Sequence, residues 1–158
     1  MARSTVVAGA AFQNVGVGTT PGWTCPECGR LFGRRGQGHA CSPGMSVEEY
    51  FSTGPPWEKP VFDRVMAHVS TLGPVHADAV QVGIFLKNPK KFAELRPMTR
   101  WVAISFGLRR RATHRTITRK VVDYNGRFWH VCNVRDPSEV DDDLLALLTE
   151  AYELAQTS

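Results

Sequence analysis

The chain has 158 residues, of which 42% are hydrophobic and 22% are charged, and its formal net charge is +4. These proportions are typical of a globular protein and exclude a chain that is disordered throughout. No apolar run reaches the roughly 20 residues that a bilayer-spanning helix needs, so we expect no membrane partner.

The amino end, residues 1–22, contains one cation, Arg3, and a short apolar patch diluted by alanine and glycine. A secretory signal has a longer apolar region and a stronger basic flank. We therefore interpret these residues as a disordered tail and expect a cytoplasmic protein.

Residues 23–42 contain three of the four cysteines, spaced Cys-x2-Cys and then, after ten residues, His-x-Cys. Cysteines clustered beside a histidine favour a metal site in a reducing compartment over disulfides. A structural zinc site takes four nitrogen or sulfur ligands, and the segment supplies Cys25, Cys28, His39 and Cys41. Because a complete set of protein ligands leaves no position for substrate, we predict a structural Zn²⁺ in a knuckle that folds on binding it.

The start of this segment, Cys25 to Phe32, resembles the start of a nucleic-acid-reading zinc finger. The resemblance ends there, because Gly33, Gly36 and Gly38 disfavour a recognition helix and the second histidine of that pattern is absent. We expect this knuckle not to read base pairs in the major groove as those fingers do.

Two helices are predicted after the knuckle. Ser46 and Glu49 have the spacing of a capping box, and the helix that they begin must end before Gly54-Pro55-Pro56. A second helix should begin near Glu58 and carry an apolar stripe as far as Gly73-Pro74.

The middle of the chain changes to period-two alternation, which is typical of strands with one buried face. The alternation runs from Val80 to Leu86 and from Val102 to Leu108, and a further short strand is predicted around Phe92 to Leu95. Asn125-Gly126 is a strong hairpin signal between residues 117–124 and 127–134.

A last helix is predicted from Asp141 to Gln156, because aspartates in its first turn suit the helix dipole and leucines form one apolar face. Helices, then antiparallel strands, then a helix predict an α+β domain over residues 46–156. We expect an antiparallel sheet of about four to five strands with helices packed on one face.

Charge is distributed unevenly: residues 87–127 contain twelve Lys/Arg and two acids, whereas residues 136–158 contain seven acids and no Lys or Arg. A basic segment can neutralise phosphates, although a solvated hairpin loop against the acidic helix explains it equally well. The candidate nucleic-acid contacts are Arg34, Arg35, Arg109, Arg110, Arg111, Arg115, Arg119 and Lys120.

Trp101 and Trp129 would stack on bases if they were exposed, but large aromatic residues are usually buried, and we expect a helix to cover them. His130 and Cys132 share a strand face with apolar residues, so we interpret them as core and not as a catalytic pair. No nucleophile elbow, metalloprotease or dinucleotide-binding motif is present, and we assign no catalytic residue.

Several stretches share one further resemblance. They are residues 23–30 with His39 and Cys41, 47–51, 72–75, 91–95, and 142–152. In order and spacing they resemble a bacterial family known as domain of unknown function 5655, over about residues 46 to 156, with the zinc segment as an amino-terminal addition. The resemblance implies the architecture but no reaction.

The leading hypothesis from the sequence is a non-enzymatic zinc-containing module that binds nucleic acid through the basic hairpin. One alternative is an adaptor whose basic hairpin meets an acidic protein surface; a steep dependence on salt would favour nucleic acid. A more distant alternative follows from a faint likeness of the capped helix pair to frataxin-like domains proposed to handle iron. These would need a carboxylate cluster built from Glu48, Glu49 and residues 141–143.

Overall fold

The computed structural model describes residues 22–41 and 43–157 of the chain. Apart from Gly22, the predicted tail over residues 1–22 lies outside this part. The elements in chain order are β1 (Trp23–Thr24), β2 (Leu31–Phe32), α1 (Val47–Phe51), α2 (Glu58–Val69), β3 (His76–Val80), β4 (Gly83–Lys87), β5 (Lys91–Pro97), β6 (Val102–Leu108), β7 (Val122–Tyr124), β8 (Arg127–Val134), the 3-10 helix η2 (Pro137–Glu139) and α3 (Asp142–Thr157).

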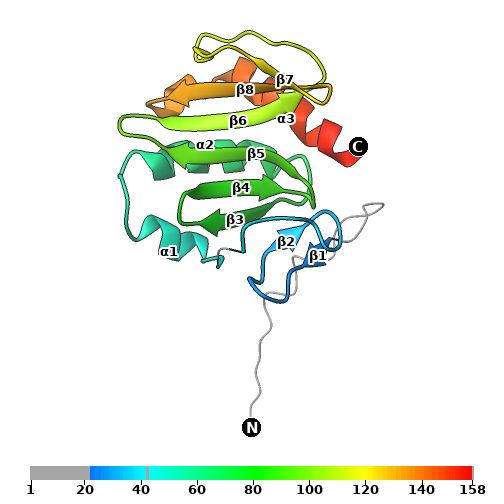
Figure 1. Cartoon of the computed structure of the whole chain (residues 1–158). Helices are drawn as coiled ribbons and strands as arrows, with labels where there is room; N and C mark the ends of the chain where they lie inside the picture. Colours follow the sequence, from blue (N-terminus) through cyan, green and yellow to red (C-terminus); the bar gives the residue numbers. More distant parts are fainter. Residues whose placement is uncertain (1–21, 42, 158) are drawn as a thin grey trace.

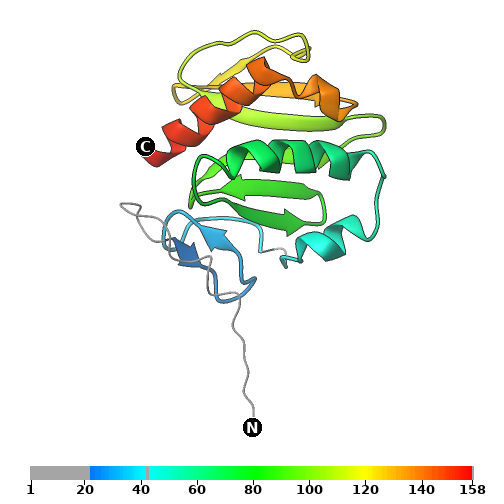
Figure 2. The same cartoon turned by 180° about the vertical axis from the view of Figure 1, so that it is seen from behind.

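Six strands form one antiparallel sheet in the order β3-β4-β5-β6-β8-β7. The helices lie on one face of this sheet, with α1 near the β3 edge (Figure 1). Seen from behind, α2 and α3 cross the sheet side by side (Figure 2). The α+β class with helices on one face is confirmed, but the sheet has six strands and not four to five.

The hydrophobic core fills the space between the sheet and α2 and α3. Alternate strand residues point into it, among them Leu86, Ile104 and Phe106, each with no exposed surface. Leu144 and Leu148 of α3 meet them from the helical side and are equally buried. Each such side chain contributes about 1.5–3 kcal/mol through removal from water.

The helix boundaries follow local signals in the sequence. Ser46 and Glu49 form both halves of a capping box, because the Glu49 amide donates to Ser46 Oγ at 3.0 Å and the Ser46 amide donates to Glu49 Oε2 at 3.2 Å. The Tyr50 hydroxyl then donates to Glu58 Oε2 at 2.7 Å and joins α1 to the first turn of α2. The short first helix and the start of the second are confirmed.

The alternating stretch from Val80 to Leu86 is a hairpin and not a single strand. β3 ends at Val80, β4 begins at Gly83, and the two intervening residues turn the chain. Val82 is consequently 56% exposed, contrary to its expected place on the buried face. A Cβ at Gly83 would lie 2.5 Å from the Leu95 carbonyl oxygen, so the close approach of β5 requires glycine at the start of β4.

The hairpin around Asn125-Gly126 is confirmed, since both residues adopt positive φ values of 55° and 78° as a two-residue turn requires. Its first strand is much shorter than expected, because only residues 122–124 pair with β8. Ile117 forms a single bridge to Cys132. The basic stretch that precedes β7 is therefore a loop and not a strand. None of the described helices has the length and apolar character to cross a membrane.

Candidate metal centre and adjacent cationic groove

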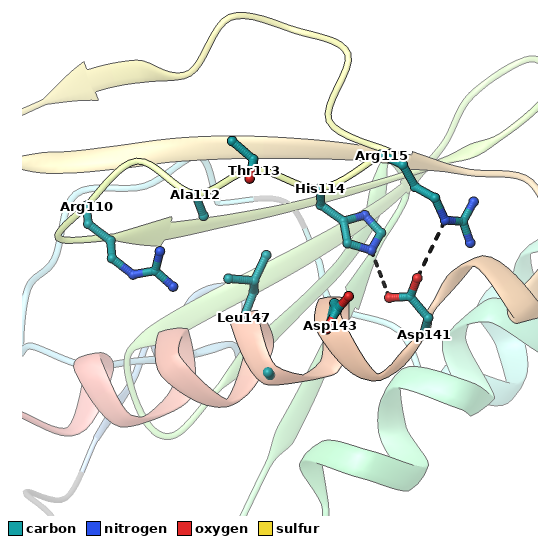
Figure 3. Close-up of a pocket in the computed structure, with 9 residues that line it drawn as sticks. Arg110, Ala112, Thr113, His114, Arg115, Asp141, Asp143 and Leu147 are labelled. Carbon is teal, nitrogen blue, oxygen red and sulfur yellow. Dashed lines mark hydrogen bonds and ion pairs between the residues drawn. The ribbon is translucent and has the colours of Figure 1, made fainter.

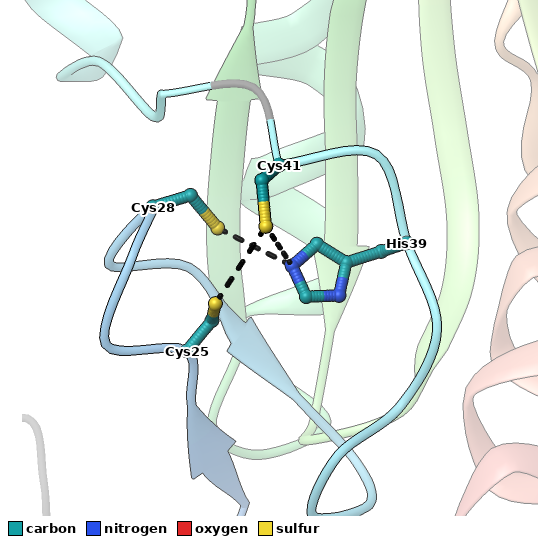
Figure 4. Close-up of side chains that lie close together, drawn as sticks. All are labelled: Cys25, Cys28, His39 and Cys41. Atoms are coloured by element: carbon teal, nitrogen blue, oxygen red, sulfur yellow. Dashed lines mark hydrogen bonds between the residues drawn. The ribbon is translucent and has the colours of Figure 1, made fainter.

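The four predicted ligands converge on one point. The turn between β1 and β2 supplies Cys25 and Cys28, and the chain after β2 returns to supply His39 and Cys41 (Figure 4). The ligand atoms of all four residues lie within 4.8 Å of one another. The turn depends on Gly29, which has a φ of +74° and donates its amide to the Cys25 carbonyl at 2.8 Å.

The spacing of the ligand atoms fits a tetrahedral metal site. Zinc–sulfur bonds of about 2.3 Å and zinc–nitrogen bonds of about 2.0–2.1 Å place ligand atoms about 3.5–3.8 Å apart in a tetrahedron. Cys25 Sγ lies 3.9 Å from Cys41 Sγ, and His39 Nε2 lies 3.4 Å from Cys28 Sγ and 3.3 Å from Cys41 Sγ. The cluster can therefore hold a metal ion.

The surroundings of His39 favour the ligand role. Its Nδ1 lies 2.7 Å from the Gln37 carbonyl oxygen, which can only accept, so Nδ1 carries the proton and Nε2 presents its lone pair to the cluster. The imidazole stacks on the Phe32 ring at 4.0 Å between centroids, which fixes its plane. Metal-binding histidines commonly have such a carbonyl partner.

The cysteines differ in how readily they ionise. The pKa of Cys25 is lowered to about 7, chiefly because the Cys28 backbone amide donates a hydrogen bond to its sulfur. Partial desolvation within the cluster, together with the neighbouring Cys25 and Cys28, raises the pKa of Cys41 to about 11. Burial likewise raises the pKa of Cys132 to about 11, far from this cluster in the core of the sheet domain. A low pKa at Cys25 suits a thiolate ligand, whereas Cys132 is held as a thiol.

The knuckle is docked on the sheet through three charged side chains. Asp78 Oδ2 of β3 accepts from Arg30 Nε at 3.0 Å and from Lys87 Nζ at 2.7 Å. Lys87 Nζ also donates to the Leu31 carbonyl at 2.6 Å and lies 4.1 Å from the centre of the Phe32 ring. Burial lowers the pKa of Lys87, an effect that Asp78 opposes. This buried network fixes the knuckle on β3 and β4.

A groove of about 920 Å³ lies where the docked knuckle meets the sheet face that carries no described helix. We call it the cationic groove. Its walls carry six basic side chains and no Asp or Glu. The basic residues are Arg30, Arg34, Lys87, Lys90, Lys91 and Arg127. Four aromatic residues complete the walls: Phe32, Phe85, Tyr124 and Trp129.

The expectation that a helix covers Trp129 is wrong. Trp129 pairs with Gly107 of β6 in the sheet, on the opposite side of β8 from the core residue His130. A Cβ at Gly107 would lie 3.3 Å from the indole, so the absence of a side chain lets the ring lie close over the β6 backbone. Trp129 is half-buried and lines the cationic groove.

The structure places the predicted basic contacts in different settings. Arg34 lines the cationic groove, and Arg35 is exposed on the knuckle. Arg111 donates to the Val121 carbonyl at 3.0 Å and lies 4.8 Å from the centre of the Phe128 ring. The other predicted contacts lie in the loop between β6 and β7. Among them, Arg109, Arg119 and Lys120 are exposed without an ion pair to any described residue.

Arg110 and Arg115 are engaged by acidic residues. Arg110 forms a two-pronged pair with Glu150 of α3, at 2.8 and 3.0 Å. Arg115 forms an ion pair with Asp141 at 3.5 Å (Figure 3). It also lies 3.6 Å from Glu139. These contacts support a basic loop that packs against the acidic helix. The sequence alone did not decide between this arrangement and phosphate binding.

The same region contains a chain of polar contacts that the sequence did not reveal. His114 Nε2 lies 2.8 Å from Asp141 Oδ1 (Figure 3). His114 Nδ1 lies 2.8 Å from Thr116 Oγ1. Asp141 Oδ1 also accepts from the Leu144 amide at 3.0 Å, which caps α3. Thr116 is only 4% exposed, so the Thr116 end of this chain is buried, whereas His114 and Asp141 line a pocket of about 550 Å³.

His130 and Cys132 have no exposed surface, as expected of core residues. His130 Nε2 accepts from the Ala112 amide at 2.9 Å, and its ring stacks on Phe106. Burial lowers the pKa of His130, so the imidazole is neutral at physiological pH. With no exposed surface, neither side chain is accessible to a substrate in this structure.

The carboxylates that an iron-handling site would need do not come together. Glu49 is committed to the capping box, and Asp141 to His114 and the α3 amide. Among residues 22–41 and 43–157, the cluster of three cysteines and His39 is the one group of metal-ligating side chains with suitable spacing. The frataxin-like alternative therefore has no described site.

Comparison with curated proteins finds no match, and comparison with solved structures finds none. A family model described as a domain of unknown function matches residues 47–155, which cover α1 to α3 and exclude the knuckle. The chain therefore belongs to the DUF5655 family, with its cysteine–histidine knuckle placed before the family domain.

Proposed function

We propose that this protein is a non-enzymatic, zinc-containing module that binds nucleic acid in the cationic groove. The composition of the groove carries this proposal: six Lys or Arg and four aromatic residues line it, and no carboxylate does. Polyanions gain affinity from such a surface because each neutralised phosphate releases condensed counterions. Aromatic residues among the cations are typical of surfaces that contact bases.

Zinc is the metal proposed for the cluster. Three thiolates and one imidazole in tetrahedral spacing are soft ligands that favour zinc and suit neither calcium nor magnesium. Its proposed role is structural, because four protein ligands complete the coordination shell. Thiolate ligands need a reducing compartment, which supports the expected cytoplasmic location.

The basic loop is proposed as a secondary contact surface. Arg109, Arg119 and Lys120 of this loop, and Arg35 of the knuckle, are exposed and free of ion pairs to described residues, so they can meet phosphates outside the groove. Arg110 and Arg115 must first leave their acidic partners. Exposed ion pairs contribute about 0–1 kcal/mol, so breaking these two pairs to contact phosphates costs little free energy.

Fluorescence anisotropy with labelled DNA and RNA oligonucleotides, at several salt concentrations and on protein of measured zinc content, tests the proposal. We expect binding that weakens log-linearly with salt, with a slope of about −0.7 per phosphate contact on single strands. No binding at low salt would refute a nucleic-acid role. The alternative, an adaptor for an acidic protein surface, would then be pursued through partner capture.

A further inference from the structure

We propose that the cationic groove binds single-stranded nucleic acid, with an unpaired base stacked on the indole of Trp129 and the neighbouring phosphates held by Arg34, Lys90 and Arg127. This inference rests on the proposed function and names the class of nucleic acid that the groove takes. Four features of the groove support it.

The first feature is the position of the Trp129 ring. Three of its atoms lie 3.3–3.4 Å from where a Cβ of Gly107 would stand, so the ring is held against the β6 backbone. One side of the indole is thus covered by the sheet, and the side chain still lines the groove. A ring that rests on the sheet and is still half-exposed in the groove is a stacking platform, since every base has a π-face that can cover the exposed part of the indole.

The second feature is a cation held between two aromatic rings. Lys91 Nζ lies 5.5 Å from the centre of the Trp129 ring and 5.2 Å from that of Phe85. Lys91 Nζ also forms an ion pair with Glu94 Oε1 at 3.2 Å. Lys91 therefore places a positive charge close to both rings of the groove.

The third feature is the separation of structural cations from available ones. Arg30 and Lys87 are buried and paired with Asp78, so they hold the groove together. Arg34, Lys90 and Arg127 form no ion pair with any described residue. These three cations lie on the knuckle, the β4–β5 turn and β8, and so surround the aromatic floor on separate elements.

The fourth feature is the shape of the contact surface. The floor of the groove is the face of a β-sheet, and no helix of the described chain projects from that face to enter a major groove (Figure 1). Bases in a duplex are stacked and paired, so a ring lying against a sheet reaches only bases that are splayed out. Tyr124, 66% exposed at the groove edge, offers a further ring to a neighbouring base.

The test compares four probes of equal length: a single strand of DNA, one of RNA, their duplex, and an abasic strand with the same phosphates. We expect the base-bearing single strands to bind at least tenfold more tightly than the duplex or the abasic strand. Trp129→Leu, which keeps an apolar side chain over Gly107, should weaken base-bearing strands by about 5- to 100-fold and leave the abasic strand unchanged. Trp129→Phe should retain a large part of the affinity.

Circular dichroism and zinc content confirm that each variant is folded, and Tyr124→Ala at an exposed position gives a second measure of stacking. Binding of all four probes with equal affinity, unaffected by Trp129→Leu, would overturn the stacked single strand and leave nucleic-acid binding in place. Failure of every probe to bind at low salt would overturn both proposals. Tight binding of the duplex alone would likewise overturn this inference.

Discussion

Arg30 of the knuckle and Asp78 of β3 form a buried ion pair across 48 positions of sequence, with 3.0 Å between Nε and Oδ2. Lys87 shares the same carboxylate oxygen. One acid therefore balances two buried cations, and the position of the knuckle relative to the sheet depends on it.

Asp78→Ala is expected to release the knuckle from the sheet, because undocking returns Arg30 and Lys87 to water. Removing one partner of a buried pair costs about 3–5 kcal/mol, which sets the upper limit for the loss in unfolding free energy. Urea denaturation and hydrogen exchange at residues 30–32 measure both effects. Asp63→Ala is the matched control, since its exposed pair with Lys59 should contribute only about 0.5 kcal/mol. Unchanged protection at residues 30–32 would contradict the docking role.

Cys28→Ser is expected to lose the bound metal and disorder residues 23–41, while the sheet domain stays folded on its own core. Metal binding supplies roughly 10–16 kcal/mol to small zinc modules, far more than the few apolar contacts of the knuckle. Metal content and limited proteolysis report the result, and nucleic-acid affinity should fall with the loss of one groove wall. Cys132→Ala is the control and should keep its metal. Global unfolding of Cys28→Ser would show that the knuckle and the sheet form one cooperative unit.

Arg127→Glu is expected to weaken single-strand binding and to reduce the slope of log affinity against log salt by about 0.7, the value for one lost phosphate contact. The control is Arg100→Glu, which makes the same charge change at an exposed residue in the β5–β6 turn, outside the groove lining. Equal losses in the two variants would indicate that net charge alone governs binding.

Gly107→Ala tests the indole position without changing any charge. Its Cβ would lie 3.3 Å from the Trp129 ring, so the ring must move by a few tenths of an ångström. We expect a shift in tryptophan emission and weaker binding of base-bearing strands, with the abasic strand unaffected. The same emission and affinity as the parent protein would mean that the ring position does not matter.

Glu58 gives a pH-dependent prediction. Burial raises its pKa above the ordinary value of 4.5, while the hydrogen bond from Tyr50 partly opposes the rise. A carboxyl group with a raised pKa in the folded state stabilises the protein below its unfolded pKa, and this contribution is lost as pH rises through the folded pKa. Glu58→Gln keeps an acceptor for Tyr50 and removes the titration. The variant should gain stability relative to the parent as pH rises from 4 to 7, measured by urea denaturation; a constant difference would contradict this.

Features encoded by neighbouring residues were predictable from the sequence. The Ser46–Glu49 capping box and the Asn125-Gly126 turn act over a few positions, the metal ligands Cys25 to Cys41 lie within 16 positions of one another, and the structure has all three features. Val82 was misplaced because alternation does not stop at a two-residue turn. The sheet consequently gained a strand.

The groove could not be predicted, because distant residues build it. Asp78 looks like an ordinary strand residue until folding places Arg30 beside it. The exposure of Trp129 depends on which face of the sheet the helices cover. Period-two alternation shows that a strand has two faces but does not identify the covered one. Gly107, opposite Trp129 in the sheet, was the available clue, since glycine within a strand often marks the close approach of another group.

The loop between β6 and β7 covers part of an open sheet edge, an arrangement that proteins use against aggregation. β8 has eight residues, but β7 covers only three of them, which would leave a long row of unpaired backbone groups at the outer edge. Residues 116 and 117 fill part of this gap, through the Asn133 amide to the Thr116 carbonyl at 3.0 Å and the bridge from Ile117 to Cys132. The unpaired backbone groups of an open strand edge can pair with a strand of another chain. Arginines beside the β8 edge add charge repulsion between copies. Shortening the loop would therefore favour self-association before it altered the core.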